Sequence, residues 1–380
     1  MKHRILVEGW RFFPHSYAIV NMFQLLALAR REDVELYVAD ASIPFSHWRE
    51  TRGLLSAADE AALAALPHGD PREAYDVHFH IGFPYEFRRS ASKRTATFIT
   101  SEFGGVPSAH FAGTPDFKAL AKADDFVAIT PSNWAAGACY ARGLSQHSVA
   151  VVPHGVEPKI FHPDGEARAA TRAKLNLNGF VFLNVGALTP NKGIETLLHA
   201  FGAVAQLRPE ARLLLKGLDP LHNSRTRLRA EVAKLPAAIR QSVLEKTLYI
   251  GDSWSFEDMA ALYRAADCYV SPYHAEGFNI PVLEAAASGL PLICTRGGPT
   301  EDFVTEYFCR KIESTRQNVS FEDVPGVQLM PKLDHLVKLM LPAIDDEAWR
   351  RAASSAAVTH THTHFNWDAV ASKLVDAFTA

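Results

Sequence analysis

Short apolar runs alternate with stretches of helical periodicity along most of the chain. In the first half, the pattern predicts strands at 5–8, 34–39, 76–81, 95–100, 125–130 and 148–152, with helices that are clearest at 17–30 and 133–142. In the second half, it predicts strands at 180–185, 211–216, 247–250, 268–271 and 290–295, with helices at 194–207, 225–234, 255–265 and 281–288. This alternation indicates an α/β protein with parallel sheets.

Two domains are expected, because 380 residues exceed one ordinary domain. The stretch from Pro153 to Gly179 is rich in proline and charge, which is typical of a linker. We therefore place one domain at 1–155 and the other at 170–365. An amphipathic helix at 366–380 is expected to follow, with Trp367 on its apolar side. The alternating Thr and His residues at 359–364 are expected to form a polar connector before it.

Composition narrows the classes of function. The chain is 48% hydrophobic and 21% charged, as in ordinary globular proteins, and its net charge of −3 gives no general attraction to nucleic acid. Its four cysteines lack metal-ligand spacing, no signal peptide is recognisable and no apolar run is long enough to span a bilayer. A cytoplasmic protein is expected. A small basic cluster (Arg88, Arg89, Lys93, Arg94) is usually a solvated face, but it leaves room for peripheral membrane contact.

The segment from His274 to Thr295, HAEGFNIPVLEAAASGLPLICT, carries the strongest chemical signal. Glu276 and Glu284 flank a turn that opens into an alanine-rich helix. Free N–H groups at a helix N-terminus favour a phosphate, and a carboxylate on either side can bind sugar hydroxyls. Surface or capping carboxylates would explain one of these glutamates, but not the turn residues Gly277, Phe278, Asn279 and Pro281 together. The segment therefore indicates a nucleotide-sugar site.

A second phosphate-binding candidate lies in the loop after the strand at 180–185. Lys192 stands in this strand-to-helix loop between Gly186 and Gly193. Its ammonium could reach a diphosphate as a point charge. A solvated loop lysine is the alternative interpretation.

Both segments resemble the donor site of retaining glycosyltransferases of the GT-B fold, family-4 type (glycosyl transferases group 1). The resemblance extends to VGALTPNKGIETLLHAF, to the stretch from Val151 to Glu157 and to the closing helix with Trp367. It implies two Rossmann-like, doubly wound α/β domains facing a central cleft. The first domain would lie on the acceptor side and be completed by the helix at 366–380, and the second would bind the donor.

The resemblance also implies roles for single residues. Glu276 would contact donor-sugar hydroxyls, Glu284 the nucleotide ribose, and Lys192 the diphosphate beside Gly186. Amides from Gly277, Phe278, Asn279 and Ile280 would lie near the sugar and phosphates. The chain departs from the family pattern in two places: Ala187 replaces a frequent arginine, and Asn279 replaces a frequent glycine. Asparagine tolerates a positive φ better than most residues, so the turn can be retained.

In the first domain, the resemblance implies that His80, the second histidine of a strand-end His-x-His, approaches the donor sugar. His78 and His80 would share one face of their strand. Metal binding by the pair is disfavoured. Glu102 follows the next strand and would orient donor or acceptor, although a capping role explains it equally well. Ser16 is a plausible N-cap for the helix at 17–30, beside the donor.

The implied function is retaining transfer of a hexosyl unit from a UDP- or GDP-sugar to a hydroxyl of a saccharide or lipid-linked acceptor. Cell-surface polysaccharide synthesis is the setting that the family suggests. No cofactor or metal is expected, because no Asp-x-Asp pair is present to bridge a diphosphate through a cation. A GT-B-type sugar-nucleotide epimerase or hydrolase and a non-catalytic sugar-nucleotide-binding subunit remain alternatives. A dehydrogenase is disfavoured, because the first loop lacks Gly-x-Gly-x-x-Gly.

Overall fold

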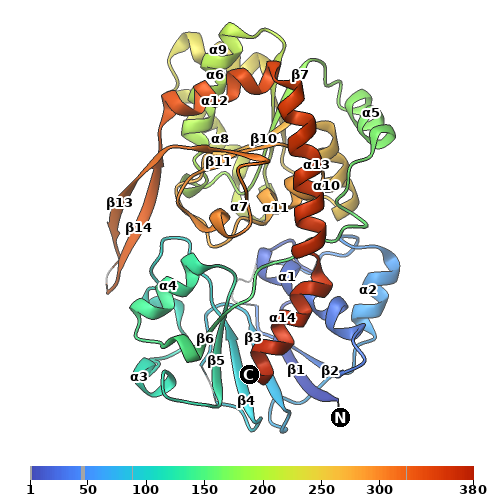
Figure 1. The fold of residues 1–380 in the computed structure, drawn as a ribbon, viewed down its shortest axis with the longest axis vertical. Helices are drawn as coiled ribbons and strands as arrows, with labels where there is room; N and C mark the ends of the chain where they lie inside the picture. Colours follow the sequence, from blue (N-terminus) through green and yellow to red (C-terminus); the bar gives the residue numbers. More distant parts are fainter. Residues whose placement is uncertain (1, 44–47, 88, 322) are drawn as a thin grey trace. The chain divides into compact units, whose positions relative to one another are not determined.

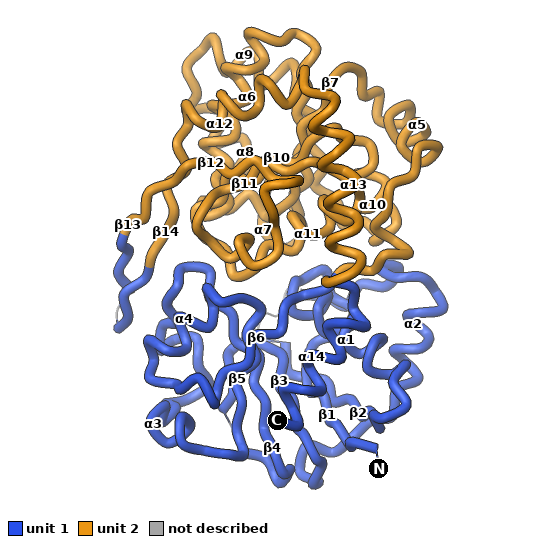
Figure 2. The backbone as a smooth tube through the Cα atoms, viewed as in Figure 1, with its two compact units in different colours: residues 1–155, 318–326, 365–380 blue, residues 156–317, 327–364 orange. Residues whose placement is uncertain are grey.

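The computed structural model describes residues 2–43, 48–87, 89–321 and 323–380 (Figure 1). The chain divides into two compact units (Figure 2). Unit 1 comprises residues 1–155, 318–326 and 365–380, and unit 2 comprises residues 156–317 and 327–364. Sequence analysis had assigned 318–326 to the second domain and 156–169 to a linker. The structure groups the former with unit 1 and the latter with unit 2.

Unit 1 is built on a six-stranded parallel sheet with the order β2-β1-β3-β4-β5-β6. Every residue of β3 and of β5 is buried, which fits a parallel sheet covered on both faces. The strands are β1 (His3–Gly9), β2 (Val34–Asp40), β3 (Val77–Ile81), β4 (Arg94–Phe98), β5 (Phe126–Thr130) and β6 (Val149–Val151).

The helices of unit 1 include the C-terminal helix of the chain. They are α1 (Ser16–Ala29), α2 (Ala57–Ala64), α3 (Phe117–Leu120), α4 (Asn133–Ala141) and α14 (Trp367–Thr379). In Figure 1, α14 lies alongside α1, and the two helices are in contact. The Trp367 ring stacks on Phe23 with ring centroids 5.5 Å apart, and Gly155 lies so close that an added Cβ would be 2.6 Å from the indole. The last helix therefore packs on unit 1, as the resemblance implied.

Unit 2 repeats this plan with a second parallel sheet, in the order β12-β11-β10-β7-β8-β9. Its strands are β7 (Phe180–Val185), β8 (Ala211–Lys216), β9 (Thr247–Ile250), β10 (Cys268–Ser271), β11 (Leu292–Thr295) and β12 (Cys309–Ile312). Its helices are α5 (Gly165–Lys174), α6 (Ile194–Leu207), α7 (Asp219–His222), α8 (Ser224–Lys234), α9 (Ala237–Lys246), α10 (Phe256–Ala265), α11 (Ile280–Ala287), α12 (Leu333–Asp345) and α13 (Glu347–His364). The buried face of α6, including Leu197 and Phe201, packs into the core with β7 and β8.

Two segments differ from the sequence-based expectation. Residues 359–364 are not a polar connector but the last turns of α13, an alanine-rich helix in which His360 and His364 contact each other at helical spacing. Sequence analysis also missed a two-stranded sheet of β13 (Ser314–Ser320) and β14 (Pro325–Pro331). The residues of β13 are polar and mostly exposed, so no apolar run marked it. Across the described ranges, no helix has the length and apolar character needed to cross a membrane.

Candidate active site

Two loops at the carboxyl edge of the unit 2 sheet are joined by backbone hydrogen bonds. The loop after β10 donates from the N–H groups of His274 and Ala275 to the Asn191 carbonyl in the loop after β7, at 2.7 and 3.1 Å. The Asn191 side-chain amide donates in return to the Ala275 carbonyl at 3.1 Å. Since β7 and β10 are neighbours in the sheet, these loops meet at the edge where parallel α/β sheets bind ligands.

Gly193 makes this close approach possible. Its φ is +68°, in the left-handed region, and an added Cβ would lie 1.9 Å from the carbonyl oxygen of Pro272. Any other residue would therefore push the two loops apart. Gly193 also ends the short 3₁₀ turn Pro190–Lys192 and precedes α6, so it sets where Lys192 lies.

Lys192 and Glu276, predicted from separate motifs, form an ion pair here. The Nζ–Oε2 distance is 2.8 Å, and the side chains are 21% and 10% exposed respectively. The ammonium is accessible to an anionic ligand, while the carboxylate beside it can accept hydrogen bonds from hydroxyls. A cation and a hydrogen-bond acceptor therefore lie side by side at this edge of the sheet.

The turn before α11 has the conformation that the sequence suggested. Asn279 adopts φ 79° and ψ 65°, which confirms the expected positive φ, and Ile280 begins the helix. The Asn279 side-chain amide donates to the Ser271 hydroxyl at 3.1 Å, and both groups are buried. Gly277 and Phe278 are also buried, and Phe278 stacks on Phe303 with centroids 4.7 Å apart. The turn is a packed element of unit 2.

Glu284 lies in α11 and accepts a hydrogen bond from the Tyr263 hydroxyl at 2.7 Å. Burial raises the pKa of Glu284 to about 7, and the bond from Tyr263 opposes this shift. The pKa of Tyr269 is raised chiefly by burial and further by the charges of Glu276 and Glu284. Both carboxylates therefore act on one buried phenol.

A second lysine at this edge was missed by sequence analysis. Lys216 is the last residue of β8, and its carbonyl accepts from the Gly186 N–H at 2.9 Å. Its buried ammonium donates to the carbonyls of Gly217 and Asp252, each at 2.6 Å. Burial lowers the pKa of Lys216 to about 8. Its position at the end of an apolar strand was the available signal.

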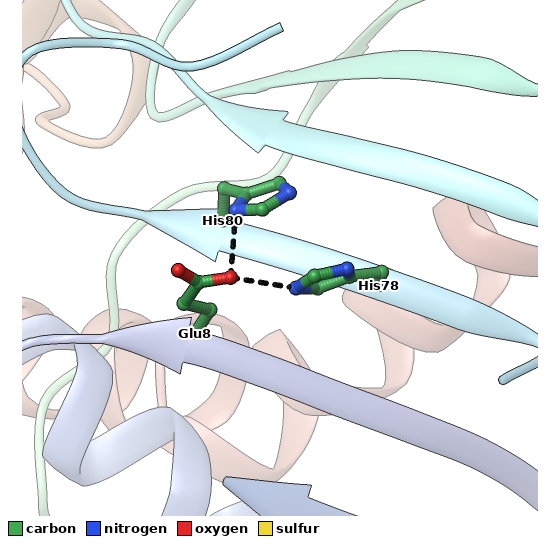
Figure 3. A group of neighbouring side chains, drawn as sticks. All are labelled: Glu8, His78 and His80. Atoms are coloured by element: carbon green, nitrogen blue, oxygen red, sulfur yellow. Dashed lines mark hydrogen bonds and ion pairs between the residues drawn. The ribbon is translucent and has the colours of Figure 1, made fainter. Parts of the chain in front are cut away.

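In unit 1, His78 and His80 share the carboxylate of Glu8 (Figure 3). The Glu8 Oε2 lies 2.9 Å from His78 Nε2 and 3.4 Å from His80 Nδ1. Sequence analysis did not find Glu8 as their partner, because it is 70 residues from His78 along the chain. The pairing of β1 with β3, which sets Glu8 opposite His80, brings them together.

These three residues form the one group in the described part of the chain that offers three potential metal ligands close together. Their ligand atoms lie within 4.8 Å of one another. Two imidazoles and a carboxylate can bind Zn²⁺. The 2.9 Å contact is equally the length of a hydrogen bond with a charged acceptor.

Glu102 and Ser16 have different outcomes. Glu102 is exposed on the loop after β4, and its carbonyl accepts from Trp134 Nε1 at 3.0 Å. Its assigned role stays a prediction.

Ser16 is not the N-cap of α1, which corrects our assignment. His15 holds that position with extended backbone, its Nδ1 accepts from the Tyr17 N–H at 3.3 Å, and Ser16 is the first helical residue.

The basic cluster is occupied by contacts within unit 1. Arg89 pairs with Asp125 at 3.3 Å and Lys93 with Asp76 at 2.7 Å. Arg94 donates to the carbonyls of Phe378 and Ala380 at the end of α14. Arg88 lies outside the described residues. These contacts favour a solvated, structural face.

Comparison with solved structures matches the fold over nearly the whole chain. A glycosyltransferase from Rickettsia africae ESF-5 aligns over 100% of this chain and 98% of its own, with a TM-score of 0.71 and 13% identity. HepE from Anabaena, in complex with UDP and glucose, aligns over 99% of both chains, with a TM-score of 0.67 and 15% identity. The fold is therefore of the GT-B class with two Rossmann-like units, as predicted from the sequence.

Comparison by sequence identifies the family of the segment that holds the unit 2 loops. Residues 167–320 match the model of glycosyl transferases group 1. Mannosylfructose-phosphate synthase from Agrobacterium fabrum is 31% identical over 158 residues, which is 41% of this chain and 34% of that protein. A GDP-mannose-dependent monoacylated alpha-(1-6)-phosphatidylinositol monomannoside mannosyltransferase from Corynebacterium glutamicum is 27% identical over 235 residues, 59% of this chain and 54% of that protein.

The chain thus spans about a third to a half of the length of these curated relatives. The resemblance to glycosyl transferases group 1 that the motifs indicated is confirmed for residues 167–320, which include Lys192, Glu276 and Glu284.

Proposed function

We propose that the chain is a retaining glycosyltransferase that moves a hexosyl unit from a UDP- or GDP-sugar to a hydroxyl of a saccharide or lipid-linked acceptor. The observation that carries this proposal is the Lys192–Glu276 pair, at 2.8 Å, on two joined loops at the sheet edge. Helices α6 and α11 begin beside these loops. The complex of HepE with UDP and glucose and the GDP-mannose dependence of the Corynebacterium relative support a nucleotide-sugar donor.

The proposed donor contacts follow from charge. The Lys192 ammonium binds the diphosphate, together with amides at the first turns of α6 and α11. Glu276 accepts hydrogen bonds from sugar hydroxyls, and Glu284 accepts them from the ribose. Ala187 adds no charge, so binding depends more heavily on Lys192 and the helix dipoles than in relatives with an arginine there.

The proposed reaction exchanges one bond for another on the same face of the sugar. The bond from the anomeric carbon to the phosphate oxygen breaks, the bond to the acceptor oxygen forms, and the departing diphosphate takes the acceptor's proton. Lys192 stabilises charge on the leaving group, which is the largest expected contribution to the rate. His80 acts on the transferred sugar and Glu102 orients the acceptor. We propose no metal and no cofactor, because the lysine and helix dipoles supply the charge.

The setting that we propose is assembly of cell-surface polysaccharide or glycolipid from cytoplasmic donors. Among relatives, the phosphatidylinositol mannoside mannosyltransferase supports a lipid-linked acceptor. The contacts of the basic cluster give no support to membrane attachment.

The test is product analysis with UDP- and GDP-hexoses, each with and without a panel of saccharide acceptors. Acceptor-dependent release of nucleoside diphosphate, with a product whose anomeric configuration by NMR matches the donor, supports the proposal. Release of diphosphate and free sugar without an acceptor would instead assign an epimerase or hydrolase. Binding of a donor without turnover under any condition would assign a non-catalytic subunit.

A further inference from the structure

Within unit 1, one oxygen of the Glu8 carboxylate contacts two buried histidine rings (Figure 3). The side chain of His78 is 0% exposed, that of His80 7% and that of Glu8 16%. The ring centroids of the two histidines are 4.1 Å apart. An ionised carboxylate with so little access to water needs hydrogen-bond donors; His78 Nε2 provides one at 2.9 Å, and His80 Nδ1 faces the same oxygen at 3.4 Å.

The geometry specifies which nitrogen of each ring carries a proton. A carboxylate can only accept hydrogen bonds, so the His78 nitrogen bonded to Glu8 must be an N–H, and the nearby carboxylate favours a proton on the His80 nitrogen that faces it. For His78 this nitrogen is Nε2, at 2.9 Å, and for His80 it is Nδ1, at 3.4 Å. The two neighbouring histidines are therefore held as opposite tautomers. In its neutral form, His80 keeps its lone pair on Nε2.

The backbone around Glu8 is held in place. Glu8 and His80 are paired in the β1–β3 register, each one residue before the end of its strand. Gly9 follows Glu8 and packs so tightly that an added Cβ would lie 2.7 Å from the Ile81 carbonyl oxygen. The carboxylate is thus fixed at the carboxyl edge of the sheet, where ligands of α/β sheets bind.

We propose that Glu8 is a positioning residue for His80. It holds His80 as the Nδ1–H tautomer and so leaves the buried Nε2 as a hydrogen-bond acceptor, while the Nε2–H of His78 holds the same carboxylate oxygen. That His80 in this tautomer serves the transferred sugar rests on the proposed function. The arrangement follows the general rule that the bond made by one imidazole nitrogen decides what the other can do.

The first experiment measures imidazole tautomers by long-range ¹H–¹⁵N NMR in the free protein. Wild-type protein should give the Nδ1–H form for His80 and the Nε2–H form for His78. In Glu8→Gln, the amide can also donate, so His80 should lose its single tautomer. The matched control is Glu35→Gln, in the neighbouring strand β2, where an exposed carboxylate accepts from Tyr37; it should leave both histidines unchanged.

A wild-type His80 in the Nε2–H form overturns the proposal even if Glu8→Gln does not fold. An unchanged His80 tautomer in folded Glu8→Gln overturns it as well. Zn²⁺ is added alone as a third arm. Stoichiometric Zn²⁺ binding that Glu8→Gln abolishes would make the cluster a metal centre and reject the positioning role, whereas no such binding supports it.

The second experiment is kinetic. Glu8→Gln should lower kcat at least tenfold and leave KM for the donor within about threefold, because it changes the state of His80 and leaves the proposed donor contacts of Lys192, Glu276 and Glu284 in place. In a His80→Ala background, Glu8→Gln should have no further effect on kcat. Additive losses would contradict action through His80. Since the tautomers are measured without substrate, a failure of the proposed function leaves that result intact, and the two failures can be told apart.

Discussion

At the scale of single residues, the side chains of the candidate sites are held by partners distant in sequence. Lys192 pairs with Glu276, Glu284 with Tyr263, and His80 with Glu8. Lys192 and Glu276 could be predicted because loops after the strands of parallel sheets mark ligand sites, and Glu284 and His80 through the resemblance of their motifs. Glu8 could not, because only the order of strands β1 and β3 brings it to His80.

The Lys192–Glu276 pair gives the first prediction. Lys192→Ala removes the ammonium proposed to stabilise the leaving group, and Glu276→Ala removes the acceptor for sugar hydroxyls. Each should lower kcat/KM at least tenfold while the far-UV circular dichroism spectrum is unchanged. Lys234→Ala is the control, because Lys234 forms an ion pair of the same 2.8 Å length with Glu231 on the exposed surface of α8. Wild-type rates in Lys192→Ala would reject its role.

Glu284 gives a prediction about pH. Its pKa is about 7 in the folded protein against an ordinary value of 4.5, so between these pH values the folded state keeps a proton that the unfolded state loses. Stability should therefore fall as pH rises from 4.5 to 7, by about 1–3 kcal/mol given the partial exposure of the side chain. Glu284→Gln lacks this ionisation. In urea unfolding, its free energy of unfolding should therefore rise relative to that of wild type between pH 4.5 and 7, and the difference should stay constant above pH 7.

Glu257→Gln, an exposed substitution in the first turn of α10, is the control for this series. It should follow the wild-type pH profile. A Glu284→Gln profile parallel to wild type would show that burial does not raise the Glu284 pKa.

At the scale of elements, the apolar runs predicted the central strands of both sheets well. Strands β7, β8, β9 and β10 and helix α6 have the predicted bounds. Prediction failed for strand β13, whose residues are mostly exposed and therefore carry no apolar pattern. It also failed at the start of α1, where His15 and not the expected Ser16 caps the helix. The joining of the two site loops was also invisible, because it depends on hydrogen bonds of Asn191.

Gly193 tests the importance of that junction. Gly193→Ala places a Cβ at a position with a positive φ, where it clashes with the Pro272 carbonyl. The substitution should therefore destabilise unit 2 by about 2 kcal/mol or more. Donor binding should weaken with it, because Lys192 precedes Gly193 directly. Gly165→Ala is the control: it begins α5 and has no atom within 4 Å of an added Cβ. Equal thermal shifts for the two variants would contradict this account.

At the scale of the whole molecule, the chain repeats one parallel α/β plan twice and returns at its end to the first unit. The alternation of strands and helices made this fold predictable. The segment 318–326, which we predicted in the second domain, is grouped with unit 1 by contacts such as those of Asp323 with Ser108 and Arg142. Contacts between residues so far apart leave no trace in local sequence patterns.

The return of α14 to unit 1 gives a prediction for Trp367. This side chain is 3% exposed, stacks on Phe23 and packs on Gly155. Trp367→Ala should lower the free energy of unfolding of unit 1 by about 3–5 kcal/mol, measured by urea unfolding. Tyr307→Ala, at a side chain that is 80% exposed, should cost less than about 0.5 kcal/mol. A small effect at Trp367 would mean that α14 does not stabilise unit 1.

The most direct test of the central claim is the thermal stability of wild-type and Lys192→Ala protein, each with UDP-, GDP- and ADP-sugars. A ligand bound at a hundred times its Kd stabilises the folded state by about 2.7 kcal/mol. The account predicts a rise in Tm for wild type with a UDP- or GDP-sugar and a much smaller rise for Lys192→Ala. No shift with any donor, or an equal shift in both proteins, would contradict a diphosphate site at Lys192.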